Sequence, residues 1–149
     1  MTAVAVDLAG ARDGTIAVRA ASGTMVAGRV RLATSFWARF RGLMGSASLN
    51  PDAGLYLPVN SIHMLFMRFP IDAVFVSSQG ADGDRRIVAI RAGLPAWRGL
   101  VMPIRGASGV LELCAGTAAR QGLQPGDVVR FGQPANPGAD PVAAPPDPT

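Results

Sequence analysis

The sequence predicts a mainly β domain, and three features of the chain support that class. Residues 26–32 alternate between apolar or small side chains and a second set that carries Arg29 and Arg31, which is the period of a strand with one face in water. Short apolar runs such as 73–76 and 110–113 resemble buried strands. A Pro-Gly turn precedes one more apolar run at 128–131. The length of 149 residues fits one domain.

We divide the chain into three segments. Residues 1–24 predict an N-terminal β-hairpin extension, because alternating runs at 3–8 and 15–19 flank a loop that contains Gly and Asp. Residues 25–131 form the β domain itself. Residues 132–149 consist mainly of Pro, Ala, Gly and Asp with little to bury, so we expect a disordered tail.

Two short helices are expected inside the β domain. Residues 36–44 favour a helix that Thr34 or Ser35 caps, because apolar side chains recur along one face of it. Residues 115–121 favour one or two further helical turns that end at Gly122.

Composition limits the partners and the compartment. The 14 basic residues are all Arg, and the net charge is +4. These Arg residues are scattered without interleaved aromatic residues, which predicts a solvated surface and no nucleic-acid partner. No apolar run reaches roughly 18 residues, so we expect no membrane insertion, and no basic segment precedes the apolar N-terminus, which makes it a poor signal peptide. A cytoplasmic location follows, and Cys114 has no disulfide partner in the chain.

Residues 60–72 draw attention because they hold the only His of the chain, His63, and two of its six Met. An extended conformation would place His63 and Arg68 on opposite, largely apolar faces, as in a strand that is covered on both sides. Residues 93–109 form a long connection rich in Gly and Pro that carries Arg98 and Arg105. Long loops of this kind are often functional.

The order of several short motifs between Arg31 and Phe131 resembles the uncharacterised bacterial and archaeal family called domain of unknown function 192. The motifs are Arg41-Gly42-Leu43-Met44, Gly54-Leu55-Tyr56-Leu57, Met64, Pro70-Ile71-Asp72 leading into 73–76, 87–90, 110–113, Ala115-Gly116, Ala118-Ala119-Arg120, Gly122 and Gly126-Asp127. The resemblance implies a mainly β fold, a β-sandwich resembling a jelly roll, with one or two short α-helices. It implies no established activity. Where the commoner family form has Trp-Met-Lys-Asn-Thr, residues 63–67 are His-Met-Leu-Phe-Met, so a function of that Lys-Asn pair would be lost or altered here.

Catalytic and metal chemistry find little support in the sequence. A cysteine nucleophile would need Cys114 beside His63 with Asp72 as the orienting group, and nothing places Cys114 near His63. A metal site would have to draw mostly on Asp72 and Glu112, and the spacing matches no zinc pattern. The loop at 77–86 has two Asp followed by two Arg, unlike a calcium loop. The chain has no phosphate loop or dinucleotide motif, so we predict neither a metal nor a cofactor.

The remaining polar residues are the candidates for a ligand- or partner-binding site. They are Asn60, His63, Arg68, Asp72, Arg98, Arg105 and Glu112. Structural roles are the alternative: Asp72 can accept backbone N–H bonds at a strand entry or pair with an Arg, and Glu112 can face solvent on the side away from Leu111 and Leu113. Several polar residues within apolar strands are costly unless they are paired, so we expect a network or a cleft.

We predict a non-catalytic binding module for a small polar or anionic ligand or a protein partner, in which Arg98 and Arg105 supply charged donors. One alternative is a hydrolase- or isomerase-like enzyme that uses His63 with Asp72 or Glu112 as acid and base. Another is a structural accessory protein without a ligand. A cleft that joins His63 to a carboxylate would favour the enzyme, whereas an apolar patch beside the Arg loop would favour a protein partner.

Overall fold

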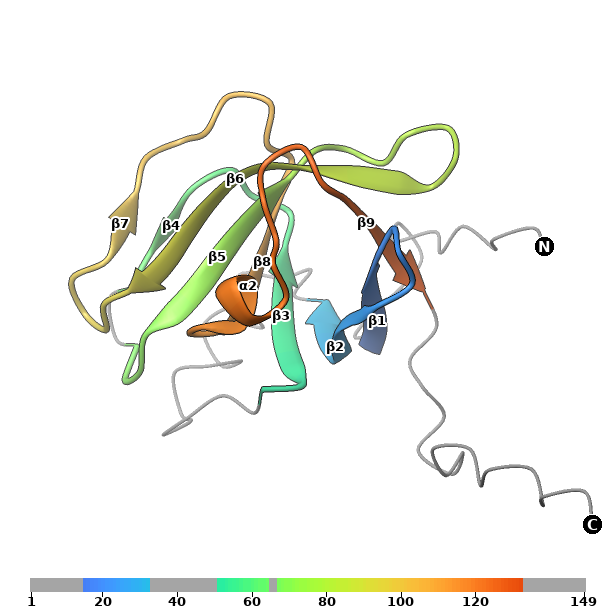
Figure 1. The fold of residues 1–149 in the computed structure, drawn as a ribbon. Helices are drawn as coiled ribbons and strands as arrows, with labels where there is room; N and C mark the ends of the chain where they lie inside the picture. Colours follow the sequence, from blue (N-terminus) through green and yellow to red (C-terminus); the bar gives the residue numbers. More distant parts are fainter. Residues whose placement is uncertain (1–14, 33–50, 65–66, 133–149) are drawn as a thin grey trace, which may run out of the picture.

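The structure, a computed structural model, describes residues 15–32, 51–64 and 67–132 of the chain (Figure 1). Short strands dominate this part, and one helix follows the eighth strand. In chain order the elements are β1 (Thr15–Ala20), β2 (Met25–Leu32), β3 (Ala53–Leu57), β4 (Ile62–His63), β5 (Ile71–Val76), β6 (Asp84–Leu94), β7 (Leu100–Val101), β8 (Gly109–Cys114), α2 (Thr117–Arg120) and β9 (Val128–Gly132).

Seven of these strands close into a barrel in the order β1-β2-β3-β8-β5-β6-β9. Strand β9 completes the ring because it pairs with β1 along one edge and with the start of β6 along the other. Neighbouring strands are antiparallel except β2 and β3, which run parallel. Strands β4 and β7 form a separate two-stranded sheet.

The expected β-sandwich is wrong, although the mainly β class is correct. A sandwich stacks two separate sheets, whereas here one sheet closes on itself because β9 pairs with both β1 and β6. Alternation along each strand indicates which side chains share a face, but it carries no information about which strand edges meet. The described part of the chain contains one short helix, α2.

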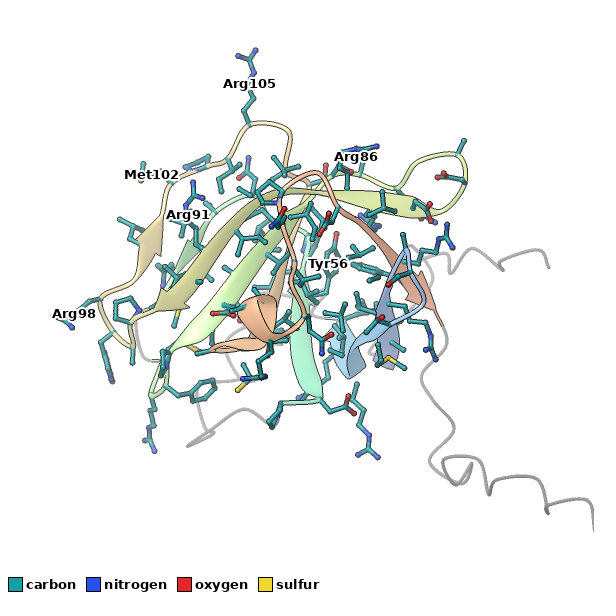
Figure 2. All side chains as sticks on the ribbon, in the orientation of Figure 1. Tyr56, Arg86, Arg91, Arg98, Met102 and Arg105 are labelled. Carbon is teal, nitrogen blue, oxygen red and sulfur yellow. The ribbon has the colours of Figure 1, made fainter. Side chains whose placement is uncertain are left out.

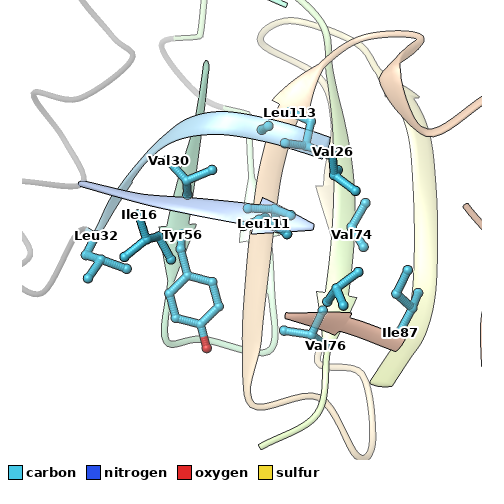
Figure 3. Close-up of a cluster of buried hydrophobic side chains, with 13 residues drawn as sticks. Ile16, Val26, Val30, Leu32, Tyr56, Val74, Val76, Ile87, Leu111 and Leu113 are labelled. Carbon is cyan, nitrogen blue, oxygen red and sulfur yellow. The ribbon is translucent and has the colours of Figure 1, made fainter. Parts of the chain in front are cut away.

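The barrel interior is an apolar core to which every barrel strand contributes (Figure 3). Val18, Val30, Val74, Leu111 and Val129 are fully buried in it. Strands β5 and β8 are buried on both faces, which explains why residues 71–76 and 109–113 read as nearly continuous apolar runs. A second layer must therefore cover their outer faces.

That cover is the β4–β7 sheet with its flanking residues, 60–64 and 95–105, which we call the flap (Figure 1). Ile62, Met64 and Val101 of the flap belong to one apolar cluster with residues on the outer faces of β3, β5 and β8. Three backbone hydrogen bonds hold the flap together: Met64 N to Gly99 O at 2.8 Å, Trp97 N to Met64 O at 3.0 Å, and Ile104 N to Asn60 O at 2.9 Å.

Several expected elements form, with different lengths. Of the described residues in the stretch 62–69, which was expected to be extended, Ile62 and His63 form strand β4. The connection at 93–109 contains β7. The turn expected at 115–121 is present as α2, and Gly122 follows with a positive φ of 63°. The expected helix at 36–44, the hairpin arm at 3–8 and almost all of the 132–149 tail lie outside the described residues. The three-segment division stays a prediction.

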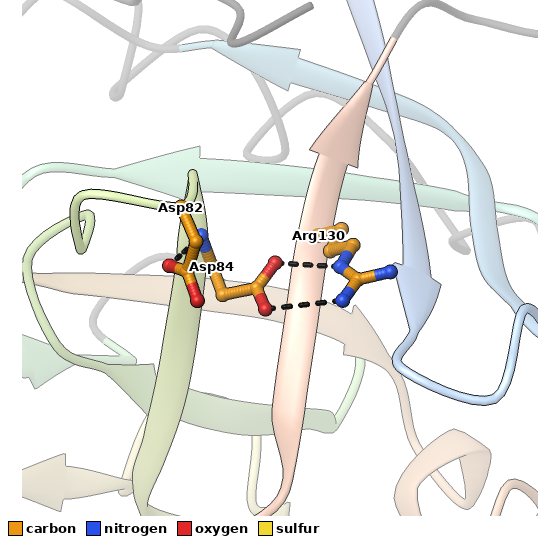
Figure 4. Close-up of polar contacts among 3 residues, drawn as sticks. All are labelled: Asp82, Asp84 and Arg130. Atoms are coloured by element: carbon orange, nitrogen blue, oxygen red, sulfur yellow. Dashed lines mark hydrogen bonds and ion pairs between the residues drawn. The ribbon is translucent and has the colours of Figure 1, made fainter. Parts of the chain in front are cut away.

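An ion pair fastens the seam between β6 and β9, where the barrel closes (Figure 4). Asp84 and Arg130 lie directly opposite each other in the register of the two strands. Arg130 Nε donates to Asp84 Oδ1 at 2.6 Å, and Arg130 Nη2 donates to Oδ2 at 3.2 Å. These bonds hold the pKa of the Asp84 carboxyl below its usual value. Because both side chains reach solvent, the pair specifies register more than it stabilises the fold.

Candidate functional site

The buried carboxylate of Asp72 organises backbone from three parts of the fold. Its Oδ1 accepts a hydrogen bond from Gly93 N at 2.9 Å, and its Oδ2 accepts from Gly116 N at 3.0 Å and Ala118 N at 2.9 Å. Asp72 is 1% exposed. The side chain thus ties the end of β6 and the start of α2 to β5. Both oxygens are engaged in the structure, which matches the backbone-acceptor alternative considered for this residue.

Glu112 is also buried, but its surroundings are apolar. On β8 it lies opposite Leu55 of β3 and Ala73 of β5, and both belong to the cluster that the flap covers. Glu112 is 6% exposed, and no side chain or backbone group of the described residues forms a hydrogen bond or ion pair with its carboxyl. Burial raises the pKa of the Glu112 carboxyl to about 7. The expected alternative of a solvent-facing Glu112 is wrong, because the second layer covers this face.

The structure keeps the proposed acid–base residues apart. Asp72 lies opposite Leu113, which faces the barrel interior, whereas Glu112 lies opposite Ala73 on the outer face. His63 is exposed on β4, where it pairs with Leu100 of β7. No hydrogen bond within the described ranges joins His63 to either carboxylate. The Cys114 thiol is free and contacts the Ala115 carbonyl oxygen at 3.8 Å.

The other candidate residues are at the surface. Arg98 and Arg105 are exposed on the flap, as is Asn60, and Arg68 is exposed in the segment that follows β4. In Figure 2, Arg98 and Arg105 project away from the body of the molecule, from the stretch of chain that contains β7. Among the described residues, no ion pair engages either guanidinium.

Three large apolar side chains that the sequence analysis did not select are exposed on the flap. Trp97 is 51% exposed, Leu100 66% and Met102 69%, and Figure 2 shows Met102 pointing outward. They are the exposed large apolar side chains of the described part of the chain. The signal was present, because Leu100 and Met102 flank Val101 with the period of a strand. It was hidden inside a Gly- and Pro-rich connection.

Charge on the flap has a single sign. The sequence has no acidic residue between Asp84 and Glu112, although this interval contains five Arg residues. It also has none between Asp52 and Asp72. Two of these Arg residues, Arg98 and Arg105, belong to the flap, and the flap contains no carboxylate to neutralise them.

Trp97 also has an unusual backbone conformation. Its φ is +68°, and it is the one non-glycine residue with a positive φ in the described ranges. A bulky residue is rarely found in this region, which costs about 1–3 kcal/mol and persists only where surrounding contacts impose it. Here the Trp97 N–H donates to the Met64 carbonyl oxygen, and the Gly99 N–H closes a turn onto the Pro95 carbonyl oxygen.

A buried polar side chain that the sequence analysis did not select, Arg85, lies in the barrel. Arg85 is buried, and its Nη1 donates to the Tyr56 hydroxyl and to the Ser77 carbonyl oxygen, both at 3.2 Å. Its guanidinium carbon lies 5.4 Å from the Tyr56 ring centroid and 4.9 Å from that of Phe131. Burial raises the pKa of Tyr56, and the Arg85 charge opposes that shift. Arg85 therefore acts as a structural cation between two aromatic rings.

No group of three or more His, Cys, Asp or Glu side chains in the described ranges gathers as metal ligands would. No helix there is long and apolar enough to span a membrane.

Comparison with known proteins places the chain in a family. The family model of DUF192, described as "Uncharacterized ACR", matches residues 17–131. The chain belongs to this family. A relative called UPF0127 protein from Thermococcus sibiricus is 33% identical over 112 residues, which cover 72% of this chain and 68% of the relative. The family resemblance expected from the sequence motifs is confirmed.

Two solved structures resemble this chain. One, from Sinorhizobium meliloti, is described as a candidate transcription regulator; it has 28% identity and a TM-score of 0.65, and the match covers 81% of this chain and 96% of that one. The other, a protein of unknown function from Novosphingobium aromaticivorans, has 28% identity and a TM-score of 0.64, with 83% and 89% covered. The family description and the second of these structures both leave the function of the domain uncharacterised.

Proposed function

We propose that this DUF192 protein is a non-catalytic binding module whose flap receives an acidic and apolar segment of a partner protein. The observation that carries the proposal is the position of Trp97, Leu100 and Met102, which are exposed together within residues 97–102. Arg98 lies inside this interval and Arg105 just beyond it. We call these five residues the flap surface.

The composition of the flap surface suits a protein interface. Exposed large apolar side chains grouped on one element mark interaction sites more often than singly scattered ones do. Trp, Met and Arg are the residue types enriched at protein interfaces, and Trp and Arg dominate interaction hot spots. The strained backbone of Trp97 supports the same reading, because it presents a Trp at a cost.

Charge complementarity supports an acidic partner segment. The flap surface carries two guanidinium groups and no carboxylate, and a partner that supplies Asp or Glu would pair with them in bidentate geometry. A nucleic acid is less well matched, since the surface lacks an extended row of basic and stacking side chains. Three apolar side chains are also a small area for membrane binding. A cytoplasmic location is part of the proposal, and the free thiol of Cys114 suits a reducing compartment.

The proposal is tested by binding of synthetic peptides to the full chain, measured by fluorescence anisotropy. One peptide set alternates Asp or Glu with Leu, Phe or Met, and a second set has Lys in place of the acidic residues. We expect the acidic set to bind, and we expect Arg98→Glu and the double change Leu100→Ser with Met102→Ser each to weaken binding by about tenfold or more.

Arg19→Glu is the matched control, because Arg19 is exposed on β1 and not on the flap. Its affinity for the acidic peptides should fall far less than that of Arg98→Glu. The proposal fails if the Lys peptides bind as well as the acidic set, or if the flap changes have no effect on binding. It also fails if phosphatidylserine vesicles or single-stranded RNA bind through the flap surface and no acidic peptide does.

A further inference from the structure

Glu112 is the one buried charged side chain of the described residues whose carboxyl or guanidinium has no polar partner there. Asp72 accepts three hydrogen bonds, and Arg85 donates two and contacts two aromatic rings. Glu112 has neither kind of contact and is 6% exposed. Nearly all buried polar groups in proteins are paired, so an exception calls for an explanation.

The neighbours of Glu112 are apolar on the strands at either side. Leu55 and Ala73 lie directly opposite it, and Val110 precedes it on the same face of β8. All three belong to the apolar cluster that Ile62, Met64 and Val101 of the flap complete. This apolar layer keeps the Glu112 side chain almost entirely from water.

The charged groups around this layer point elsewhere or lie at its surface. Arg91 of β6 lies opposite Ala73, on the side of β5 away from Glu112. Its Nη1 donates to the carbonyl oxygen of the preceding residue, Ile90. From the flap, His63, Arg98 and Arg105 are exposed, and Arg68 is exposed after β4. Cys114, the next residue on the same face of β8, is half-buried. Within the described ranges, a proton is the group that can neutralise Glu112.

The flap is the weakly held part of the layer. Its two strands are two residues long, whereas β5 and β8 pair with barrel strands along their whole length. Burial opposes ionisation of the Glu112 carboxyl and raises its pKa to about 7. An unpaired buried carboxylate is costly, and local opening of the weakly held flap should hydrate it at a smaller free-energy cost than opening of the barrel.

We propose that Glu112 is a proton-operated switch beneath the flap: protonated Glu112 lets the flap close on the barrel, and loss of that proton loosens it. The opening of the flap would also control partner binding by the flap surface, and this control of binding is the part that rests on the proposed function. Partner binding by a closed, ordered flap is then strongest when Glu112 is protonated and weakens as the pH rises.

Amide hydrogen exchange of the full chain tests the switch without any partner. The amides of Met64, Trp97 and Ile104 report on flap opening, because each donates one of the flap hydrogen bonds. After correction for the intrinsic pH dependence of exchange, we expect opening to increase about tenfold between about pH 6 and pH 8 in the parent protein. We expect no such increase in Glu112→Gln or in Glu112→Met, which keeps the volume if Gln destabilises the fold.

Asp84→Asn is the matched control, since it removes a carboxylate far from the flap, at the β6–β9 seam. Its pH response should match that of the parent. Equal pH responses of the parent and both Glu112 variants would overturn the switch, as would a parent flap that does not respond to pH. Acidic-peptide binding measured in parallel separates the two ideas: a pH-dependent flap that binds no peptide supports the switch and refutes the proposed function. A flap that binds the acidic peptides but whose opening does not change with pH supports the proposed function and refutes the switch.

Discussion

Replacing Asp72 should destabilise the whole fold, because its carboxylate accepts three backbone hydrogen bonds that no other group of the described residues can replace. In Asp72→Asn, one oxygen remains. It can still accept from Gly116 and Ala118, while the amide nitrogen faces the N–H of Gly93. One bond to a charged acceptor is lost, at about 1.5–3 kcal/mol, and two bonds become neutral and weaker.

We therefore expect a loss in the free energy of unfolding of about 2–4 kcal/mol for Asp72→Asn. For Asp72→Ala, which leaves three donors without their acceptor, we expect a larger loss of about 3–6 kcal/mol. Domains of this kind are stable by about 5–15 kcal/mol, so the Ala variant approaches unfolding. Urea denaturation followed by far-ultraviolet circular dichroism measures both losses.

Asp84→Asn serves as the comparison, because it removes a carboxylate from the ion pair at the barrel seam, where both partners reach solvent. Its loss should be well below that of Asp72→Asn. A stability of Asp72→Asn within about 0.5 kcal/mol of the parent protein would refute a structural role for Asp72. Asp72 would then return to the set of ligand-binding candidates.

Three other changes have defined outcomes. In the folded protein the pKa of Glu112 is raised from 4.5 to about 7, so the protonated carboxyl contributes stability that is fully present below about pH 4.5 and is lost as the pH rises through 7. Denaturation curves should therefore show the free energy of unfolding of the parent falling by about 3 kcal/mol over this window relative to Glu112→Gln. In Gly99→Ala, the new Cβ would lie 2.5 Å from Met64 Cγ, so amide exchange in the flap should accelerate with little change in the barrel. In Gly109→Ala, the new Cβ would overlap the Tyr56 ring, and we expect the melting temperature to fall by several degrees.

Local patterns predicted the strands well where burial on both faces made the apolar signal dense. Residues 73–76 and 110–113 are strands, and Gly126 turns the chain into β9 as the Pro-Gly pair indicated. Barrel closure was not predictable in this way, because it depends on β9 pairing with two strands that are distant in sequence. The two-residue strand β7 was missed because so short an alternation is lost among Gly and Pro.

The candidate site shows the same limit. The sequence placed Glu112 on the face opposite Leu111 and Leu113, which is correct, but the cover over that face comes from residues 40 or more positions away along the chain or from a loop. Backbone acceptance was one of the roles considered for Asp72, and the geometry supports it. The separation of His63 from both carboxylates follows from sheet register, which a single sequence does not contain.

The most direct test of the binding proposal is nuclear magnetic resonance mapping of an acidic peptide, with alternating Glu and Leu, on the isotope-labelled full chain. We predict that the largest amide shift changes lie between residues 97 and 105, and that they disappear when Arg98→Glu and Arg105→Glu are combined. Shift changes centred on the barrel around Tyr56 and Arg85, or no saturable change in the flap, would contradict the proposal that the flap surface is the binding site.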